Sequence, residues 1–172
     1  MRIIAGKWRG STLIAPPGAT TRPTGNRTRE ALFSMLTSRL GSFEGLSVVD
    51  LFAGTGALGL EALSRGAARC TFVERDRPAL EALRVNVEKL GAEGDIRAQS
   101  AENFTGGPYD LALLDPPYGT SLGQRALARI RLAPGGWASL ETARDETVEV
   151  EGYVVETERV FGKAKITLLR AI

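Results

Sequence analysis

The stretch "LSVVDLFAGTGALGLE", residues 46–61, joins an apolar run to a glycine-rich turn and then to helix-forming residues. The apolar run predicts a buried strand, and Gly54, Gly56 and Gly59 follow it in the pattern G-x-G-x-x-G that opens a helix in nucleotide-binding βαβ units. Glycines there let the backbone turn tightly and approach a ligand, with helix N–H groups pointing at it. The stretch therefore predicts an α/β fold with a ligand at the end of this strand.

The rest of the chain alternates in the same way. Further strands are predicted at "CTFVE", "DIRAQ", "YDLALLD" and "GWASLE", and helices at "NRTREALFSMLTSRLG", "RPALEALRVNVEKLG" and "SLGQRALARIRL". "ETVEVEGYVVETERV" and "KAKITLLRAI" then read as two consecutive strands that pair antiparallel. This order predicts a mostly parallel, Rossmann-like sheet with helices on both faces and ligands beyond the carboxyl ends of its strands.

The first 24 residues are predicted to form a small extension to the domain at 25–172. "RIIA" and "STLIA" are short strand candidates around the turn "GKWRG", which predicts a β-hairpin. Thr24 or Asn26 is expected to cap the first helix.

Several classes of chemistry are excluded by composition. The chain has no histidine and one cysteine, Cys70, which removes Ser-His-Asp and Cys-His catalysis and the His- or Cys-ligated metal sites. Cys70 lies inside a predicted strand and is expected in the core. No apolar run approaches the ~20 residues of a membrane span, and no signal peptide is recognisable, so we expect a cytoplasmic, metal-free monomer with no membrane partner.

Positive charge is concentrated at the amino terminus, although the net charge is only +2. Six basic residues stand against one acid in the first 30 positions, which suggests a polyanionic partner such as RNA. A solvated, arginine-rich surface would produce the same pattern. The candidate RNA contacts are Arg2, Lys7, Arg9, Arg22, Arg27 and Arg29.

Two carboxylates favour one cofactor over another. Glu74 ends the next predicted strand, 20 residues after Gly54, where a carboxylate would accept hydrogen bonds from ribose hydroxyls. Both NAD and S-adenosylmethionine enzymes share this arrangement. Asp50, however, lies four residues before Gly54, where it would repel a pyrophosphate and suit the ammonium of a methionine moiety. The pattern therefore favours S-adenosylmethionine.

The stretch "LLDPPYGT", residues 113–120, sets an acid, two prolines and a tyrosine at the tip of a buried strand. An exocyclic amine of a nucleobase becomes positive as it accepts a methyl group, so a carboxylate and a carbonyl aimed at its hydrogens would stabilise that charge. Asp115 is the candidate carboxylate, Pro116 C=O the candidate carbonyl, and Tyr118 could stack on the base. Pro117 would hold the acceptors still. The alternative is a strand-terminating Pro-Pro turn with a surface tyrosine.

Together, "MRIIAGKWRG", "RPTGNRTREALFSML", "VVDLFAGTGALGLEALSRGA", "FVERD" and "LLDPPY" resemble the RsmD family of class I S-adenosylmethionine-dependent methyltransferases. This resemblance implies a seven-stranded sheet with a reversed last strand. It implies that Asp115, Pro116, Pro117 and Tyr118 hold a target guanine. It also implies a set of cofactor-binding residues: Asp50, Phe52, Gly54, Gly56, Glu74, Arg75, Ser100, Ala101, Asp115 and Thr24. Where the family has an aspartate facing the adenine, this chain has Ser100.

The resemblance implies methyl transfer to the exocyclic N2 of a guanine in 16S ribosomal RNA, with the assembled small subunit as the expected substrate. An adenine-N6 methyltransferase acting on RNA or DNA is the main alternative, because "DPPY" also resembles those enzymes. A NAD-dependent oxidoreductase and a non-catalytic RNA-binding module stay open at this point.

Overall fold

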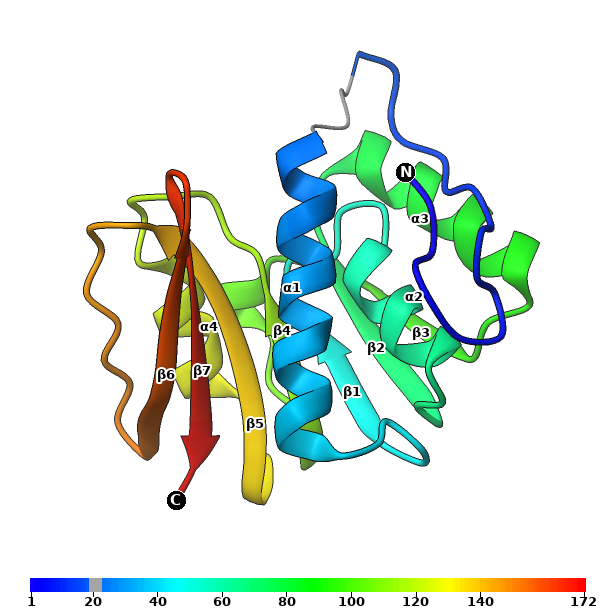
Figure 1. Cartoon of the computed structure of the whole chain (residues 1–172). Helices are drawn as coiled ribbons and strands as arrows, with labels where there is room; N and C mark the ends of the chain where they lie inside the picture. The colour runs from blue at the N-terminus through cyan, green and yellow to red at the C-terminus, as the bar shows by residue number, and fades with distance from the viewer. Residues whose placement is uncertain (19–22) are drawn as a thin grey trace.

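Seven strands form one sheet in a computed structural model that describes residues 1–18 and 23–172 (Figure 1). They are β1 Ser47–Asp50, β2 Arg69–Glu74, β3 Gly94–Ala98, β4 Tyr109–Leu114, β5 Leu132–Ala143, β6 Tyr153–Phe161 and β7 Ala164–Ala171. Their order is β3-β2-β1-β4-β5-β7-β6, and β7 runs antiparallel to both of its neighbours. The predicted Rossmann-like sheet with a reversed last strand is confirmed.

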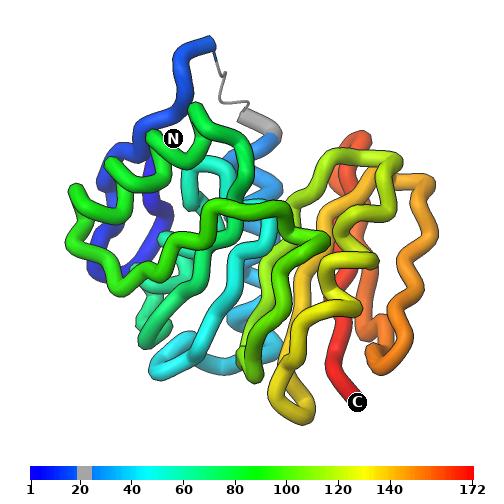
Figure 2. Tube along the Cα trace, turned by 180° about the vertical axis from the view of Figure 1, so that it is seen from behind, coloured from blue at the N-terminus to red at the C-terminus, as the bar shows by residue number. Residues whose placement is uncertain are grey.

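Helices cover both faces of the sheet, as predicted (Figures 1 and 2). On one face lie α1 Pro23–Leu40, α2 Ala57–Ser64 and α3 Arg77–Leu90, and on the other lie the short 3₁₀ helix η1 Ala101–Asn103 and α4 Leu122–Arg129. Strand β4 shows why both faces need cover. Leu111 and Leu113 enter the core beneath α1 and α2, while Ala112 and Leu114 enter the core beneath α4, because successive side chains point to opposite faces.

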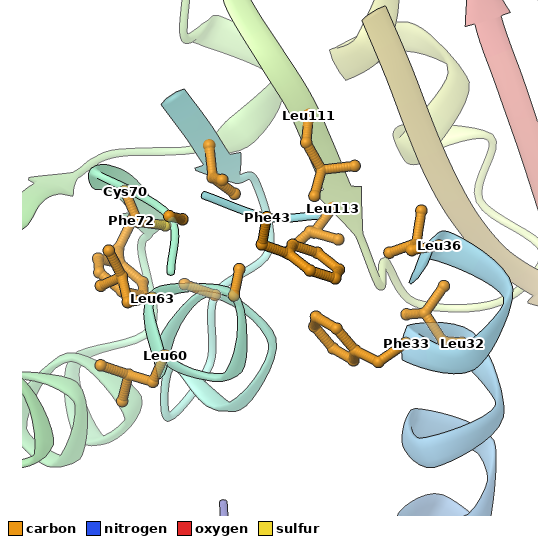
Figure 3. Packing of buried hydrophobic residues seen from close by; sticks show 14 of the residues in the cluster. Leu32, Phe33, Leu36, Phe43, Leu60, Leu63, Cys70, Phe72, Leu111 and Leu113 are labelled. Atoms are coloured by element: carbon orange, nitrogen blue, oxygen red, sulfur yellow. The ribbon is translucent and has the colours of Figure 1, made fainter. Parts of the chain in front are cut away.

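The core beneath α1 and α2 is built from leucines and aromatic rings (Figure 3). The rings of Phe33 and Phe43 lie 5.6 Å apart between centroids, a spacing typical of favourable aromatic pairs. Cys70 lies in the same core and is 1% exposed, so the expectation of a buried thiol is confirmed.

Several element boundaries differ from the sequence prediction. Strand β5 begins at Leu132, which was predicted to end the preceding helix, and that helix, α4, ends at Arg129. Helix α1 begins at Pro23, so Thr24 and Asn26 lie inside its first turn and do not cap it; proline is favoured at this first position because its missing N–H has no helical partner. Strand β6 begins at Tyr153. The residues just before it include Val148 and Val150, whose side chains are buried beneath the sheet and which make no strand.

The amino-terminal extension forms a loose hairpin held by one antiparallel bridge, Arg2 to Thr12. Ile3 and Leu13 bury their side chains in the core beneath α1 and α2. Glu61 of α2 accepts the backbone N–H groups of Ile4 and Ala5 at 2.8 and 3.0 Å. The division between extension and domain at residue 24 stays a prediction.

Asn86 of α3 anchors the second arm of this hairpin. It accepts the N–H of Ile14 at 2.8 Å and donates to the carbonyls of Ile14 and Thr55. No helix in the described part of the chain has the length and apolar character required to cross a membrane.

Replacing Gly59 with alanine should destabilise the fold. An added Cβ would lie 2.5 Å from Cε1 of Phe72 and 2.7 Å from Sγ of Cys70, so α2 would have to move off β2. We expect the free energy of unfolding in urea to fall by about 1–3 kcal/mol. The matched control is Gly25→Ala in α1, whose added Cβ meets nothing within 4 Å and should be neutral or stabilising by up to about 1 kcal/mol. Equal effects at the two sites would contradict this account.

Candidate active site

Two adjoining cavities open at the carboxyl ends of β1 and β4, where the strand order reverses. The glycine-loop cavity, of about 590 Å³, is lined mainly by residues 51–55, 73–76, 99–102 and 115–117. The α1 cavity, of about 290 Å³, lies between α1 and the ends of β4, β5 and β7. Asp115 lines both cavities. This is the position at which open α/β sheets bind their ligands.

The glycine loop is shaped by Gly54 and Gly56, which have positive φ angles of 56° and 89°. A Cβ on Gly56 would lie 2.6 Å from Cδ1 of Leu83, whereas one on Gly54 would meet nothing within 4 Å. The N–H of Gly54 donates to Oε1 of Glu74 at 2.7 Å. Oε2 of Glu74 accepts the N–H groups of Arg75 and Asp76 at 2.9 and 2.8 Å. The predicted 20-residue spacing thus brings loop and carboxylate into direct contact.

Asp50 lies beneath this loop and is fully buried. Its Oδ2 accepts the N–H of Gly59 at 2.9 Å, and its Oδ1 has no partner. Burial raises the pKa of Asp50 to about 7; the hydrogen bond from Gly59 opposes this shift and the charge of Glu74 adds to it. Neither Asp50 nor Gly56 lies on the wall of the glycine-loop cavity, whereas Phe52, Gly54, Glu74, Arg75, Ser100 and Ala101 do.

Another side of the glycine-loop cavity is formed by residues 99–102, which come directly after β3. Ser100 lies on the cavity wall, and its hydroxyl oxygen is buried without a hydrogen-bond partner. An unpaired buried hydroxyl is unfavourable, so a ligand with polar ring atoms would satisfy it. The open space at Gly54, the carboxylate of Glu74 and the unpaired hydroxyl of Ser100 fit a nucleoside-containing cofactor.

Asp115 stands at the junction of the two cavities. Although its side chain is open to solvent there, desolvation by the surrounding protein raises the pKa of Asp115 to about 8, and the charges of Glu141 and Asp50 contribute. Pro116 is buried behind it. The oxygens predicted to face an amine therefore lie on a segment fixed by two prolines.

Tyr118 lies beyond the prolines with 45% of its surface exposed. Its hydroxyl donates to Oε2 of Glu141 at 2.6 Å, and burial together with this bond raises the tyrosine pKa. The hydroxyl of Thr120 donates to the carbonyl of Pro117 at 2.8 Å and closes the turn. The ring is thus held at the protein surface near the α1 cavity.

The basic residues predicted to bind RNA are not brought together. Arg2 is exposed near the α1 cavity and Arg27 is exposed on α1, but the backbone of Lys7 is bonded to Ser64 at the far end of α2. Lys7 is therefore held at the carboxyl end of α2, whereas both cavities are lined by Ala57 and Leu58 at its amino end. Arg29, a candidate RNA contact, is only 7% exposed and donates to the carbonyl of Arg2 at 2.6 Å, so little of it is accessible to RNA at the surface. Arg22 and the side chain of Thr24 lie outside the described residues.

The sequence analysis missed residues of the α1 cavity and its rim. Glu141 ends "GWASLE", and its place beside Asp115 follows from the β4–β5 register, which pairs Leu114 with Leu140. The sequence carries no signal for this pairing. Arg144 and Lys163, together with Tyr118, line a wider groove outside this cavity. No group of His, Cys, Asp and Glu side chains among the described residues could hold a metal ion.

This sheet order, with a glycine loop after β1 and a carboxylate after β4, defines a class I methyltransferase, the class that takes its methyl group from S-adenosylmethionine. A family model described as "Conserved hypothetical protein 95" matches residues 1–170, and the chain belongs to this family, the RsmD family.

Named relatives agree with this assignment. The chain is 34% identical over 175 residues to Ribosomal RNA small subunit methyltransferase D of Haemophilus influenzae, covering 94% of this chain and 89% of that protein. It is 37% identical over 156 residues to the protein of the same name in Escherichia coli, covering 88% and 76%. The solved structure of yhhF from Escherichia coli matches with a TM-score of 0.87 at 32% identity, covering 99% of this chain and 97% of that one.

Asp50 should make the protein less stable as pH rises. Its folded pKa of about 7 exceeds the unfolded value of 3.8, so the folded state holds a proton that the unfolded state releases, and stability is lost between about pH 4 and 7. Asp50→Asn removes this loss. Between pH 4.5 and pH 8, the free energy of unfolding of the wild type should fall by on the order of 2–4 kcal/mol more than that of the variant. Urea unfolding without ligand measures this difference. Parallel pH profiles for the two proteins would contradict the assignment.

Proposed function

We propose that this protein transfers a methyl group from S-adenosylmethionine to the exocyclic N2 of a guanine in 16S ribosomal RNA, presented in the assembled small subunit. The observation that carries the proposal is Asp115, which lies between a cavity suited to a nucleoside cofactor and a second, smaller cavity. The names of the relatives at 34–37% identity supply the RNA substrate.

In this proposal the glycine-loop cavity holds the cofactor. Glu74 would accept the ribose hydroxyls, Ser100 and Ala101 would lie beside the adenine, and Phe52 and Arg75 would close the wall. Asp50 is not on the cavity wall, so its carboxylate would attract the ammonium of the cofactor from beneath the glycine loop. The cofactor supplies an electrophilic methyl group on a positively charged sulfur.

The target base would enter the α1 cavity from the groove that contains Tyr118. The Asp115 carboxylate and the Pro116 carbonyl would accept the two hydrogens of N2, turn its lone pair toward the methyl group and stabilise the positive charge that develops. In the free protein the raised pKa leaves Asp115 mostly protonated at neutral pH. A cation in the neighbouring cavity favours the ionised form that this role requires.

RNA would lie across the rim of both cavities. Arg2, Arg144 and Lys163 are exposed there or line the outer groove, where they could contact phosphates. Arg27 is exposed on α1 but lines neither cavity. Lys7 and Arg9 would reach RNA only if the substrate extends past the far end of α2. A structured particle can do this more readily than a short strand, which supports the assembled subunit as substrate.

Glu74→Ala should weaken S-adenosylmethionine binding about 10- to 100-fold, because hydrogen bonds to a charged group are worth about 1.5–3 kcal/mol. Equilibrium binding of the labelled cofactor measures this. The control is Glu81→Ala on α3, an exposed carboxylate outside both cavities, which should leave binding unchanged. If Glu74→Ala binds the cofactor as tightly as the wild type, Glu74 is not in the site.

The central experiment combines radiolabelled S-adenosylmethionine with unmethylated small-subunit RNA, supplied free and as particles, followed by nucleoside analysis. We expect label in N2-methylguanosine, with particles the better substrate. Asp115→Ala should lower transfer at least about 100-fold and leave cofactor affinity within a few-fold, whereas the exposed Asp95→Ala control should match the wild type. Label in N6-methyladenosine would move the assignment to the adenine alternative, and better labelling of free RNA would overturn the assembled-subunit proposal.

A further inference from the structure

The α1 cavity has hydrogen-bond acceptors on its sheet side and donors on its helix side. Asp115 and Glu141 lie side by side at the ends of β4 and β5, because the register pairs the preceding residues. Neighbouring strands are about 4.8 Å apart, so the two carboxyl groups can reach adjacent atoms of one planar base. On the opposite wall, α1 contributes Asn26 and Arg29.

Glu141 has unused acceptor capacity. The Tyr118 hydroxyl is bonded to its Oε2 at 2.6 Å, and the Asp115 carboxyl lies within hydrogen-bonding reach of it. A carboxylate offers about four acceptor positions, so another donor can bind Glu141 without displacing the tyrosine. The two neighbouring carboxylates repel each other, which contributes to the raised pKa of Asp115, and a ligand rich in N–H donors would relieve this repulsion.

Arg29 has unused donor capacity on the opposite wall. One of its terminal nitrogens donates to the carbonyl of Arg2, but its Nε is buried and has no partner. Asn26 is exposed beside it and adds an amide donor. Because that Nε has no accessible surface, Asn26 is the donor that a ligand in the cavity can reach on this wall.

We propose that Glu141 selects guanine over adenine by accepting the N1–H of the target base. This inference rests on the proposed function. Guanine presents N1–H and two N2 hydrogens in a row, which match Glu141, Asp115 and the Pro116 carbonyl. Adenine presents a lone pair at N1, which Glu141 would repel. A site built for a donor rejects the base that lacks it because its own polar groups are then left unpaired.

Glu141 could instead act only by positioning Tyr118 through their hydrogen bond. The two roles predict different results for a probe that lacks N1–H. If Glu141 accepts the N1–H directly, removal of its carboxylate abolishes the preference for bases that carry N1–H, and removal of the Tyr118 hydroxyl does not. In the positioning role, both changes act alike.

The test measures inhibition of methyl transfer to small subunits by free guanosine, 1-methylguanosine and adenosine. We expect guanosine to inhibit the wild type at least 10-fold better than the other two. Glu141→Gln and Glu141→Ala should lower kcat/KM about 10- to 100-fold and bring the three nucleosides within about 3-fold of one another. Tyr118→Phe should keep the preference for guanosine, and Glu156→Gln, an exposed carboxylate on β6, should match the wild type.

Cofactor affinity and urea unfolding of the Glu141 variants show whether they are folded. Folded variants that keep the guanosine preference would overturn the inference, and so would a Tyr118→Phe protein that loses it. The proposed function fails separately, if the wild type places no label in N2-methylguanosine.

Discussion

The site depends most on the hydrogen bonds between the buried carboxylate of Glu61 and the amino-terminal backbone. It is fully enclosed, and it is satisfied by the N–H groups of Ile4 and Ala5 and by the guanidinium of Arg65. Removing one partner of such a buried charge is costly, so the amino-terminal segment is firmly attached to α2. Met1 consequently lines both cavities, and the carbonyl of Arg2 orients Arg29. The extension is therefore a wall of the site.

The carboxyl groups at the carboxyl ends of β1, β4 and β5 lower the stability of the ligand-free protein. Asp50 and Asp115 are both desolvated, and Asp115 also lies beside Glu141, so both carboxyl groups have raised pKa values. In the absence of ligands, the ionised form of these groups is therefore less stable in the folded state than in the unfolded state. A bound cation on one side and a donor-rich base on the other would favour it, which links occupancy of the two cavities through the charge of Asp115.

Local signals predicted most of the fold, and long-range contacts account for what was missed. Apolar strands, the glycine loop and the Gly54–Glu74 spacing are short-range patterns, and each lies where the sequence predicts. The positions of Lys7 and Arg29 depend on where the extension docks, which Glu61, Ser64 and the Arg2 carbonyl decide across more than 25 residues of sequence. Glu141 depends on the register of β4 and β5, which no single segment encodes. Site residues on one strand end were thus predictable, and their neighbours across the cavity were not.

The environment of Cys70 has a practical consequence for spectroscopy. It is the one cysteine of the chain, it is 1% exposed, and burial raises its thiol pKa well above the usual value, with the charge of Asp50 adding to the shift. Thiolates are the species that react with maleimides and iodoacetamides, so the native thiol will be inert in the folded protein. A cysteine introduced on the surface would then take a fluorophore or spin label at a single position, with the native thiol left in place.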